Sequence, residues 1–453
     1  MKTVYTVVIF AVIFGLNSCQ KFLDEKTDKK LVVPQTLADL QAILDDFSIL
    51  SYEPYSGEIA GGDYYLTDAD WKGISIEEYR RGYLWEKEYG TYYIDWANVY
   101  RGIYYANVIL DHLEKIPANT QEIATWNDVK GQALFLRARL LLATVGIWSK
   151  AYNPTTASTD PGIPIRTGSN FNEVSQRATV EETYRQIISD LTEAAELLNV
   201  QNTSIIRSSQ AAAFALLSRV YLYMGDYQNS FTYADKCLDI KGDLIDYNEI
   251  TSSPLYPFSE FNKEVIYAAW LQNPMPLSIN YAKVDTNLIA LYDNNDYRKT
   301  LFLRNNNNGS FSFRGSYTGS LTPFAGLGVD EVILTRAECA VRLDNAEQAV
   351  ADLNSLLENR WKKRDGSSTY LPYDNSLTAE ELLDLILKER RKELLLRGVR
   401  WPDIKRLNRD GANIVLERTI DGKRHVLPPN DPRYALPIPE EVLRNSNLQQ
   451  NNY

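Results

Sequence analysis

The chain has 453 residues, of which 44% are hydrophobic, so it is long enough to bury a substantial core. Its formal net charge is −11 at pH 7, which argues against binding to nucleic acid or electrostatic docking on anionic lipid, because both need a basic surface. The two histidines, His112 and His425, are far apart in the sequence. A metal site or a catalytic triad that depends on histidine is therefore not expected.

The N-terminus has the features of a bacterial export signal. Lys2 precedes an almost unbroken apolar run over residues 4–16, which is too short to span a bilayer but has the length of a signal-peptide core. The run ends at Leu16-Asn17-Ser18-Cys19, which resembles a lipobox. We expect a signal peptide over residues 1–18, a lipid-modified Cys19 and one mature domain over residues 19–453. An ordinary secretory signal with a chance cysteine is the alternative.

Helical periodicity dominates the rest of the chain and predicts a mainly α-helical fold. Thr179 with Glu182, and Thr378 with Glu381, form capping boxes that mark two helix starts. Strand-like alternation is scarce and short. The predicted helices cover residues 97–116, 125–149, 180–199, 208–224, 227–240, 329–343, 346–361 and 379–397.

Two pairs of these helices share an internal spacing of small residues. The first pair turns at Gly225-Asp226-Tyr227 and the second at Asp344-Asn345. Small residues at matching offsets let antiparallel helices pack closely, so both pairs resemble the tetratricopeptide hairpin. Because the two pairs are far apart in the chain, we predict a scaffold of such hairpins with long irregular insertions; two unrelated hairpins are the alternative. The matching residues are Ser218, Tyr221, Ser230, Ala234 and Cys237 in one pair, and Ala337, Ala340, Ala349, Leu353 and Leu356 in the other.

The insertions carry the aromatic residues that favour ligand binding. Residues 52–105 hold twelve of the thirty tyrosines, and a second irregular stretch spans residues 241–328. Loop aromatics give flat apolar surface with a polar edge, which suits the C–H face of a sugar ring. The segments 61–65 and 68–71 are interpreted as loop. We predict ligand contacts at four residues, namely Tyr64, Tyr65, Trp71 and, as a secondary contact, Trp270; Tyr281 ranks below these.

Other aromatic and polar residues receive structural interpretations. Trp96, Tyr100 and Tyr104 lie on one helical stripe and are assigned to the core. Cys237 and Cys339 lie in apolar helical patterns and are expected to be buried thiols, although a bridge between them is possible.

Carboxylates in the chain do not make a convincing catalytic or metal site. Glu389, Glu393 and Arg397 follow the i, i+4, i+8 spacing of intrahelical ion pairs, whereas glycosidases need two carboxylates that face each other from separate elements. Asp68 and Asp70 offer oxygen ligands for a structural calcium ion, but no ordered twelve-residue calcium loop is present. We therefore assign no cofactor and no metal, and predict a protein that is not an enzyme.

A series of short motifs resembles the SusD/RagB family of lipoproteins. The most specific runs from Glu389 to Arg406 and includes Gly398-Val399-Arg400-Trp401-Pro402-Asp403. The others, in chain order, are Cys19 to Asp24, Trp96…Tyr100-Arg101…Ile103…Asn107, Lys130 to Ala138, Pro161 to Ile165, Arg177 to Tyr184 and Leu436 to Asn451. The resemblance covers the whole mature chain in order.

The resemblance implies a helical fold with four tetratricopeptide hairpins and a SusC-like TonB-dependent transporter as partner, over which the lipoprotein sits as a lid. It also implies a lipid-anchored, surface-exposed position at the bacterial outer membrane. The usual cargo is oligosaccharide, and some relatives handle peptides. The connecting segments around residues 150–175 and 300–328 look shorter than those of many family members. This difference concerns the shape of the binding surface more than the fold.

Two other classes of function stay open. A tetratricopeptide scaffold of the cell envelope would bind peptide or protein in a bare concave groove. A surface glycosidase would need facing carboxylates in a cleft. The leading prediction is a nutrient-binding lipoprotein that takes oligosaccharide at an exposed cluster of loop aromatics and delivers it to the transporter.

Overall fold

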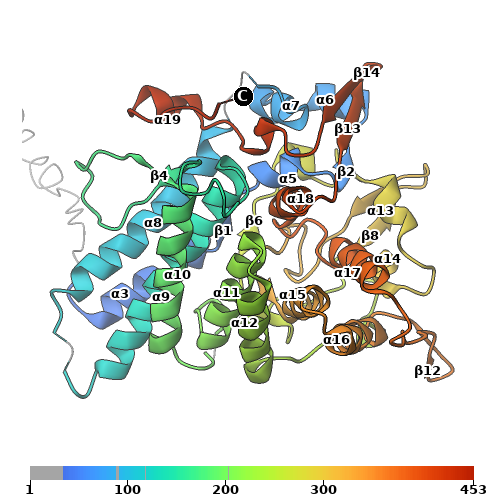
Figure 1. Ribbon diagram of the computed structural model, residues 1–453, viewed down its shortest axis with the longest axis horizontal. Coiled ribbons are helices and arrows are strands. Elements are labelled where there is room, and N and C mark those ends of the chain that lie inside the picture. Colours follow the sequence, from blue (N-terminus) through green and yellow to red (C-terminus); the bar gives the residue numbers. More distant parts are fainter. Residues whose placement is uncertain (1–33, 88–90, 118, 203, 453) are drawn as a thin grey trace, which may run out of the picture.

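The structure is a computed structural model that describes residues 34–452, except 88–90, 118 and 203 (Figure 1). The predicted signal peptide and Cys19 lie outside the described residues. None of the described helices is both long enough and apolar enough to cross a membrane. The α-helices are α3 Leu37–Leu44, α4 Phe47–Leu50, α5 Ser56–Ala60, α6 Asp68–Gly73, α7 Glu77–Tyr83, α8 Tyr93–Leu113, α9 Ile123–Trp148, α10 Val180–Leu197, α11 Gln210–Met224, α12 Tyr227–Ile240, α13 Thr286–Ala290, α14 Tyr297–Leu301, α15 Val329–Arg342, α16 Ala346–Glu358, α17 Ala379–Glu393, α18 Arg400–Arg409 and α19 Glu440–Arg444.

The long helices form a continuous series of packed neighbours that runs from left to right in Figure 1. α8 packs on α9, α9 on α10, α10 on α11, α11 on α12, α12 on α15, and α15 on both α16 and α17 (Figure 1). All eight helices predicted from periodicity are present within a few residues of their predicted bounds. The mainly α-helical prediction is therefore confirmed.

The two predicted hairpins are α11 with α12 and α15 with α16, and their small residues lie between the helices. The Ser230 hydroxyl donates to the Ser218 carbonyl oxygen at 2.8 Å. The turns need left-handed backbone, with φ +82° at Gly225 and +59° at Asp344, conformations that glycine and aspartate adopt more easily than most residues. Cys237 and Cys339 are buried free thiols, as expected.

Both predicted capping boxes are present. Thr179 accepts a hydrogen bond from the Glu182 amide at the start of α10, and Thr378 accepts one from the Glu381 amide at the start of α17. The prediction that the last helix continues to residue 397 is wrong, because α17 ends at Glu393 and Leu396 takes a positive φ of 55°. This early end separates Arg397 from the helix face that holds Glu389 and Glu393.

The strands are short and occur in pairs that fasten the insertions to the helical scaffold. β1 pairs with β6, β2 with β7, and β10 with β5, so residues 241–328 are tied both to the N-terminal insertion and to the start of α15. The strands are β1 Tyr52–Glu53, β2 Tyr64–Tyr65, β3 Pro161–Pro164, β4 Arg177–Thr179, β5 Val265–Tyr267, β6 Trp270–Leu271, β7 Lys283–Val284, β8 Leu303–Asn305, β9 Phe311–Phe313, β10 Leu327–Gly328, β11 Lys363–Arg364, β12 Ser367–Ser368, β13 Leu416–Ile420 and β14 Lys423–Leu427. Short 3₁₀ helices span Tyr247–Glu249, Met275–Leu277 and Pro432–Tyr434.

Candidate functional site

The first predicted contact segment, residues 61–71, is more ordered than expected. Tyr64 and Tyr65 form β2, which runs antiparallel to β7 with Tyr65 opposite Lys283. Residues 68–71, interpreted as loop, instead begin helix α6, because Thr67 and Asp70 form a capping box at its start. A Thr-x-x-Asp capping pair, rather than the Thr-x-x-Glu pattern used for the longer helices, is the signal that sequence reasoning missed.

Tyr64 is not exposed, so the expectation of a solvent-facing side chain there is wrong. Only 4% of Tyr64 is accessible to solvent, its hydroxyl donates to the Ile59 carbonyl oxygen at 3.0 Å, and the Arg418 guanidinium lies 5.5 Å from its ring centroid. Successive strand residues point to opposite faces, and Tyr65, the next residue, is partly exposed. Tyr64 is therefore a packing residue beneath the surface that carries Tyr65.

Tyr65, Trp71 and Tyr281 gather around the β2–β7 pair and α6; we call these three residues the α6 surface. All three are partly exposed. Trp71 donates from its indole nitrogen to the Arg80 carbonyl oxygen at 3.1 Å, which fixes its ring plane. The ring of Tyr281 packs against Gly73, where a Cβ atom would lie 3.2 Å from a ring carbon. The surface thus joins aromatic residues from both irregular segments.

Two ion pairs hold α6 in place. The Lys283 ammonium lies 2.6 Å from the Asp70 carboxylate, and Lys72 pairs with Asp421 in the turn between β13 and β14 at 2.5 Å. Although burial opposes the change, hydrogen bonds from Lys283 and Thr67 lower the pKa of Asp70. The Asp421 amide also donates to Asp68 at 2.9 Å. Asp68 and Asp70, considered as calcium ligands, both make these contacts within the protein.

Trp270 lies apart from the α6 surface, in a second aromatic group. It belongs to β6, next to β1, and its ring meets Phe47 edge-on at 5.1 Å and stacks parallel to Phe261 at 6.2 Å. Phe324 completes the group at 6.1 Å. The structure therefore places Tyr65 and Trp71 on two elements that the Lys283–Asp70 ion pair joins, whereas Trp270 belongs to the other aromatic group.

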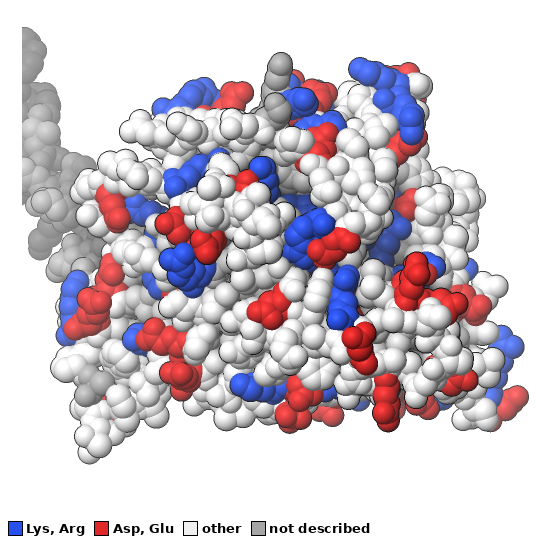
Figure 2. All heavy atoms as spheres, in the orientation of Figure 1, with Lys and Arg blue, Asp and Glu red and all other residues white. Residues whose placement is uncertain are grey.

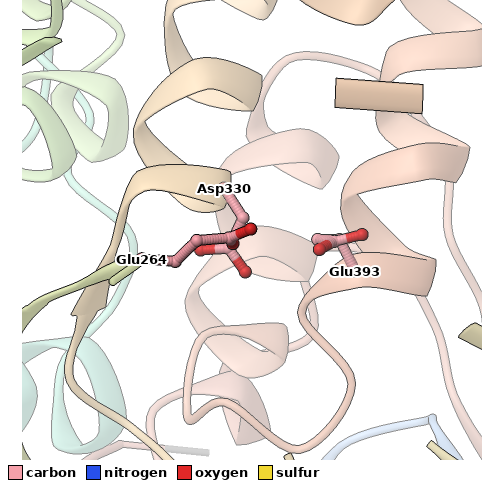
Figure 3. Close-up of side chains that lie close together, drawn as sticks. All are labelled: Glu264, Asp330 and Glu393. Atoms are coloured by element: carbon pink, nitrogen blue, oxygen red, sulfur yellow. The ribbon is translucent and has the colours of Figure 1, made fainter. Parts of the chain in front are cut away.

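Three buried carboxylates, Glu264, Asp330 and Glu393, lie close together, each on a different segment (Figure 3). Arg360 donates to both oxygens of Glu264 at 2.9 and 3.0 Å and to Glu393 at 2.8 Å. Arg397 donates to Asp330 at 3.0 Å. Burial raises the pKa of Glu264 to about 7. The carboxylate oxygens that a cation would need as ligands already accept hydrogen bonds from these guanidinium groups. The cluster is therefore an ion-pair network.

Glu389 and Glu393 belong to the same network. Arg298 bridges Glu389 and Glu393 at 2.5 and 2.8 Å, and these groups are buried. The expected intrahelical pairing of the glutamates with Arg397 is wrong, because α17 ends first and Arg397 turns to Asp330. Tertiary ion pairs with Arg298, together with the pair between Glu389 and Lys392 in the same helix, neutralise this end of α17.

A cleft of about 720 Å³ lies elsewhere; we call it the α8 cleft. Its lining residues come from α8, the loop from β3 to β4, the end of α19 and the segment after α19; Figure 1 shows where these elements lie. Tyr104, assigned to the core, is instead half-buried here and stacks on Phe171 with centroids 4.5 Å apart. The lining residues are Tyr100, Ile103, Tyr104, Asn107, Arg166, Gly168, Ser169, Phe171, Asn172, Glu173, Val174, Ser175, Arg444, Asn445, Ser446 and Asn447.

Sequence reasoning missed this cleft, although a signal was present. Phe171 lies in a polar loop, the criterion that selected Trp71, and it is 77% exposed. The loop is held by α8: the Asn107 amide donates to the carbonyl oxygens of Arg166 and Gly168 at 2.9 and 3.3 Å, and Asp111 accepts from the Ser169 amide at 2.9 Å.

Comparison with known families decides the identity of this fold. A model described as starch-binding and associating with the outer membrane, of SusD-like type, matches residues 21–222. A second model, for the SusD family, matches residues 329–453. The chain belongs to the SusD/RagB family.

Individual SusD-like proteins align with nearly the whole chain. SusD-like protein P2 of Formosa agariphila is 24% identical over 524 aligned positions, which cover 99% of each chain. The crystal structure of a SusD superfamily protein from Bacteroides thetaiotaomicron shares 24% identity with a TM-score of 0.73, over 92% of this chain and 100% of that one. A laminarin-binding SusD-like protein has a TM-score of 0.63 at 18% identity, over 92% and 98%.

The SusD-like motifs have structural roles in this chain. Asn107 accepts from Arg137 at 3.0 Å, and Arg137 pairs with Asp190, which links α8, α9 and α10. In α18, Lys405 donates to the Gly146 carbonyl oxygen at 2.7 Å at the end of α9, and burial lowers the pKa of this amine to about 7. These buried motif residues thus hold α8, α9, α10 and α18 together.

Proposed function

We propose that the protein is a lipid-anchored outer-membrane lipoprotein that binds oligosaccharide and passes it to a SusC-like TonB-dependent transporter. The observation that carries the proposal is the α6 surface, where paired elements from two distant segments carry three partly exposed aromatic residues. Family membership supports the glycan as ligand class, since the matching model is described as starch-binding and associating with the outer membrane.

The chemistry of the α6 surface suits a sugar. Aromatic rings offer apolar area for the C–H face of a pyranose at low entropic cost. The Tyr65 hydroxyl makes no hydrogen bond to any other described residue, so it is available to a sugar hydroxyl. The neighbouring Lys283–Asp70 and Lys72–Asp421 pairs supply polar groups at the rim.

The proposal includes transport but not catalysis. The N-terminal lipobox at Cys19 supports anchoring, and a soluble body held beside a transporter can raise the local concentration of its ligand. Glu389 and Glu393 are buried in ion pairs with Arg298, so they cannot reach a glycosidic bond from opposite sides, as hydrolysis requires. Purified protein is expected to leave laminarihexaose intact.

Calorimetric titration tests the binding site. Wild-type protein and a Tyr65→Ala, Trp71→Ala double variant are titrated with laminari-, malto-, cello- and xylohexaose, because a laminarin-binding SusD-like protein shares the fold. One aromatic–sugar stack contributes on the order of 1 kcal/mol, so the double variant is expected to bind tens-fold more weakly. Tyr93→Ala removes an exposed tyrosine at the start of α8 and serves as the control.

The test compares the glycan affinity of the double variant with that of the wild type, provided that both proteins are folded. The double variant should keep the circular dichroism spectrum of the wild type, since Tyr65 and Trp71 are only partly buried. If a hexasaccharide binds the wild type and the double variant with equal affinity, the α6 surface is not the binding site. If none of the four binds the wild type, the proposed ligand class is wrong.

A further inference from the structure

We infer that the α8 cleft is a second oligosaccharide site, for a neutral glycan. The inference rests on the proposed function only for the class of ligand. The cleft lies on the side of the molecule that carries α8 and β4, whereas α6 and β2 lie toward the other end of the view (Figure 1). One chain would therefore hold two stretches of glycan, or two chains, at separate places.

Two stacked aromatic rings line the α8 cleft and form an aromatic platform. Tyr104 and Phe171 stack at 4.5 Å with an interplanar angle of 29°. Phe171 is 77% exposed and Val174 is 66% exposed, although large apolar side chains are costly to leave in water. Stacked rings that remain open on one side give the flat apolar area on which a pyranose ring packs.

Polar groups without a hydrogen-bond partner among the described residues line the same cleft. Among the described residues, the side-chain amides of Asn172 and Asn447 and the hydroxyl of Tyr104 make no hydrogen bond, and all three residues line the cleft. Amides and hydroxyls both donate and accept, so they match the hydroxyl groups of a sugar. A cleft of about 720 Å³ is within the range of small-molecule sites and large enough for more than one sugar ring.

The charges in the cleft favour a neutral ligand over an acidic one. Arg166 is directed into its own loop, where it donates to the Glu173 carbonyl oxygen at 2.6 Å and to the Ser175 hydroxyl at 3.0 Å. Arg444 lies 3.6 Å from Glu441 and 3.9 Å from Glu440. Figure 2 likewise shows acidic and basic side chains interspersed over the visible face. A carboxylated or sulfated glycan would find no uncompensated positive group.

The cleft is also preformed. Asn107 and Asp111, one helical turn apart on α8, bind backbone groups at the start of the loop, and Arg166 binds backbone groups at its other end. Tyr100 donates to the Pro164 carbonyl oxygen at 2.9 Å, which fixes β3 on the same helix. Because the loop is already fastened, ligand binding does not have to order it, and this favours affinity.

The test separates the two sites. The Tyr65→Ala, Trp71→Ala variant is titrated with the same four neutral hexasaccharides, alone and with Phe171→Ala added. Phe171→Ala is not expected to disturb folding, because the side chain is largely exposed. We expect residual binding in the double variant that falls by roughly fivefold or more when Phe171 is removed. Leu371→Ala, at a residue that is 84% exposed, is the matched control.

Each outcome bears on one site. Residual binding that Phe171→Ala weakens and Leu371→Ala does not supports the α8 cleft, even if the α6 surface contributes nothing. Residual binding that Phe171→Ala leaves unchanged, or no residual binding in the double variant, overturns the inference while leaving the α6 surface intact. A tetragalacturonate titration that gives tighter binding than the neutral glycans would overturn the assignment of a neutral ligand.

Discussion

The Lys283 ammonium lies 2.6 Å from the Asp70 carboxylate and joins strand β7 to helix α6. Lys283 also donates to the Tyr281 carbonyl oxygen at 2.8 Å. The pair therefore connects the segment that carries Trp71 with the segment that carries Tyr281. It sets the spacing between two aromatic residues of the α6 surface without using either ring.

Lys283→Met should weaken glycan binding through this spacing. The variant keeps Tyr65, Trp71 and Tyr281 but removes the ionic link, so α6 is held less firmly and the rings are less well placed for one sugar. We expect affinity to fall by roughly threefold to tenfold, with a modest loss of stability in urea because both side chains are largely buried. Lys72→Met breaks the exposed pair with Asp421 and should change stability little. Unchanged affinity in Lys283→Met would show that the ion pair does not position the site.

Cys19→Ala tests the anchor. A lipid on Cys19 would hold the protein on the membrane by burial of its acyl chains, and the substitution removes the thiol that carries them. We expect the wild type in the membrane fraction and the variant in the soluble fraction after cell fractionation, detected with an antibody. Cys237→Ala, at a buried thiol, is the control for loss of a cysteine. Membrane retention of Cys19→Ala would remove the anchoring proposal.

The helical scaffold could be predicted because its signals are local. Apolar stripes and the capping boxes at Thr179 and Thr378 act within a few residues, and the helices they predicted are present. The hairpin turns could be predicted for the same reason. Gly225 and Asp344 take the left-handed backbone conformation that each turn needs. Local sequence patterns were therefore enough to predict most of the helical scaffold.

The candidate sites could be predicted only in part, because they depend on contacts between distant segments. Tyr64 and Tyr65 are adjacent in an aromatic loop, and only the pairing of β2 with β7 decides which one faces solvent. The stripe that contains Tyr104 looks like core until the loop with Phe171 is placed beside it. Nor does the spacing of Glu389, Glu393 and Arg397 reveal that Arg298 and Arg360 neutralise the glutamates.

Glu58 makes the stability of the fold depend on pH. It lies in α5, just before the candidate segment, and only 2% of the residue is exposed. Burial, with the nearby Asp63 carboxylate, raises its pKa from 4.5 to about 8, while Asp63 itself pairs with Arg391 at 2.8 Å. The folded protein therefore favours the protonated carboxyl, whereas the unfolded chain ionises it at ordinary acidic pH.

Glu58→Gln should remove this pH dependence. A raised pKa in the folded state stabilises the fold fully below about pH 4.5, and that contribution is lost as pH rises toward 8. Between these values the free energy of unfolding of the wild type, relative to Glu58→Gln, should fall by up to about 1.4 kcal/mol per pH unit. Urea unfolding from pH 5 to pH 9 measures the difference, with Glu77→Gln, an exposed glutamate in α7, as the control. Parallel profiles for the wild type and Glu58→Gln would show that Glu58 does not ionise on unfolding in this range. A gap that widens with pH for Glu58→Gln alone would identify its buried carboxyl as the source.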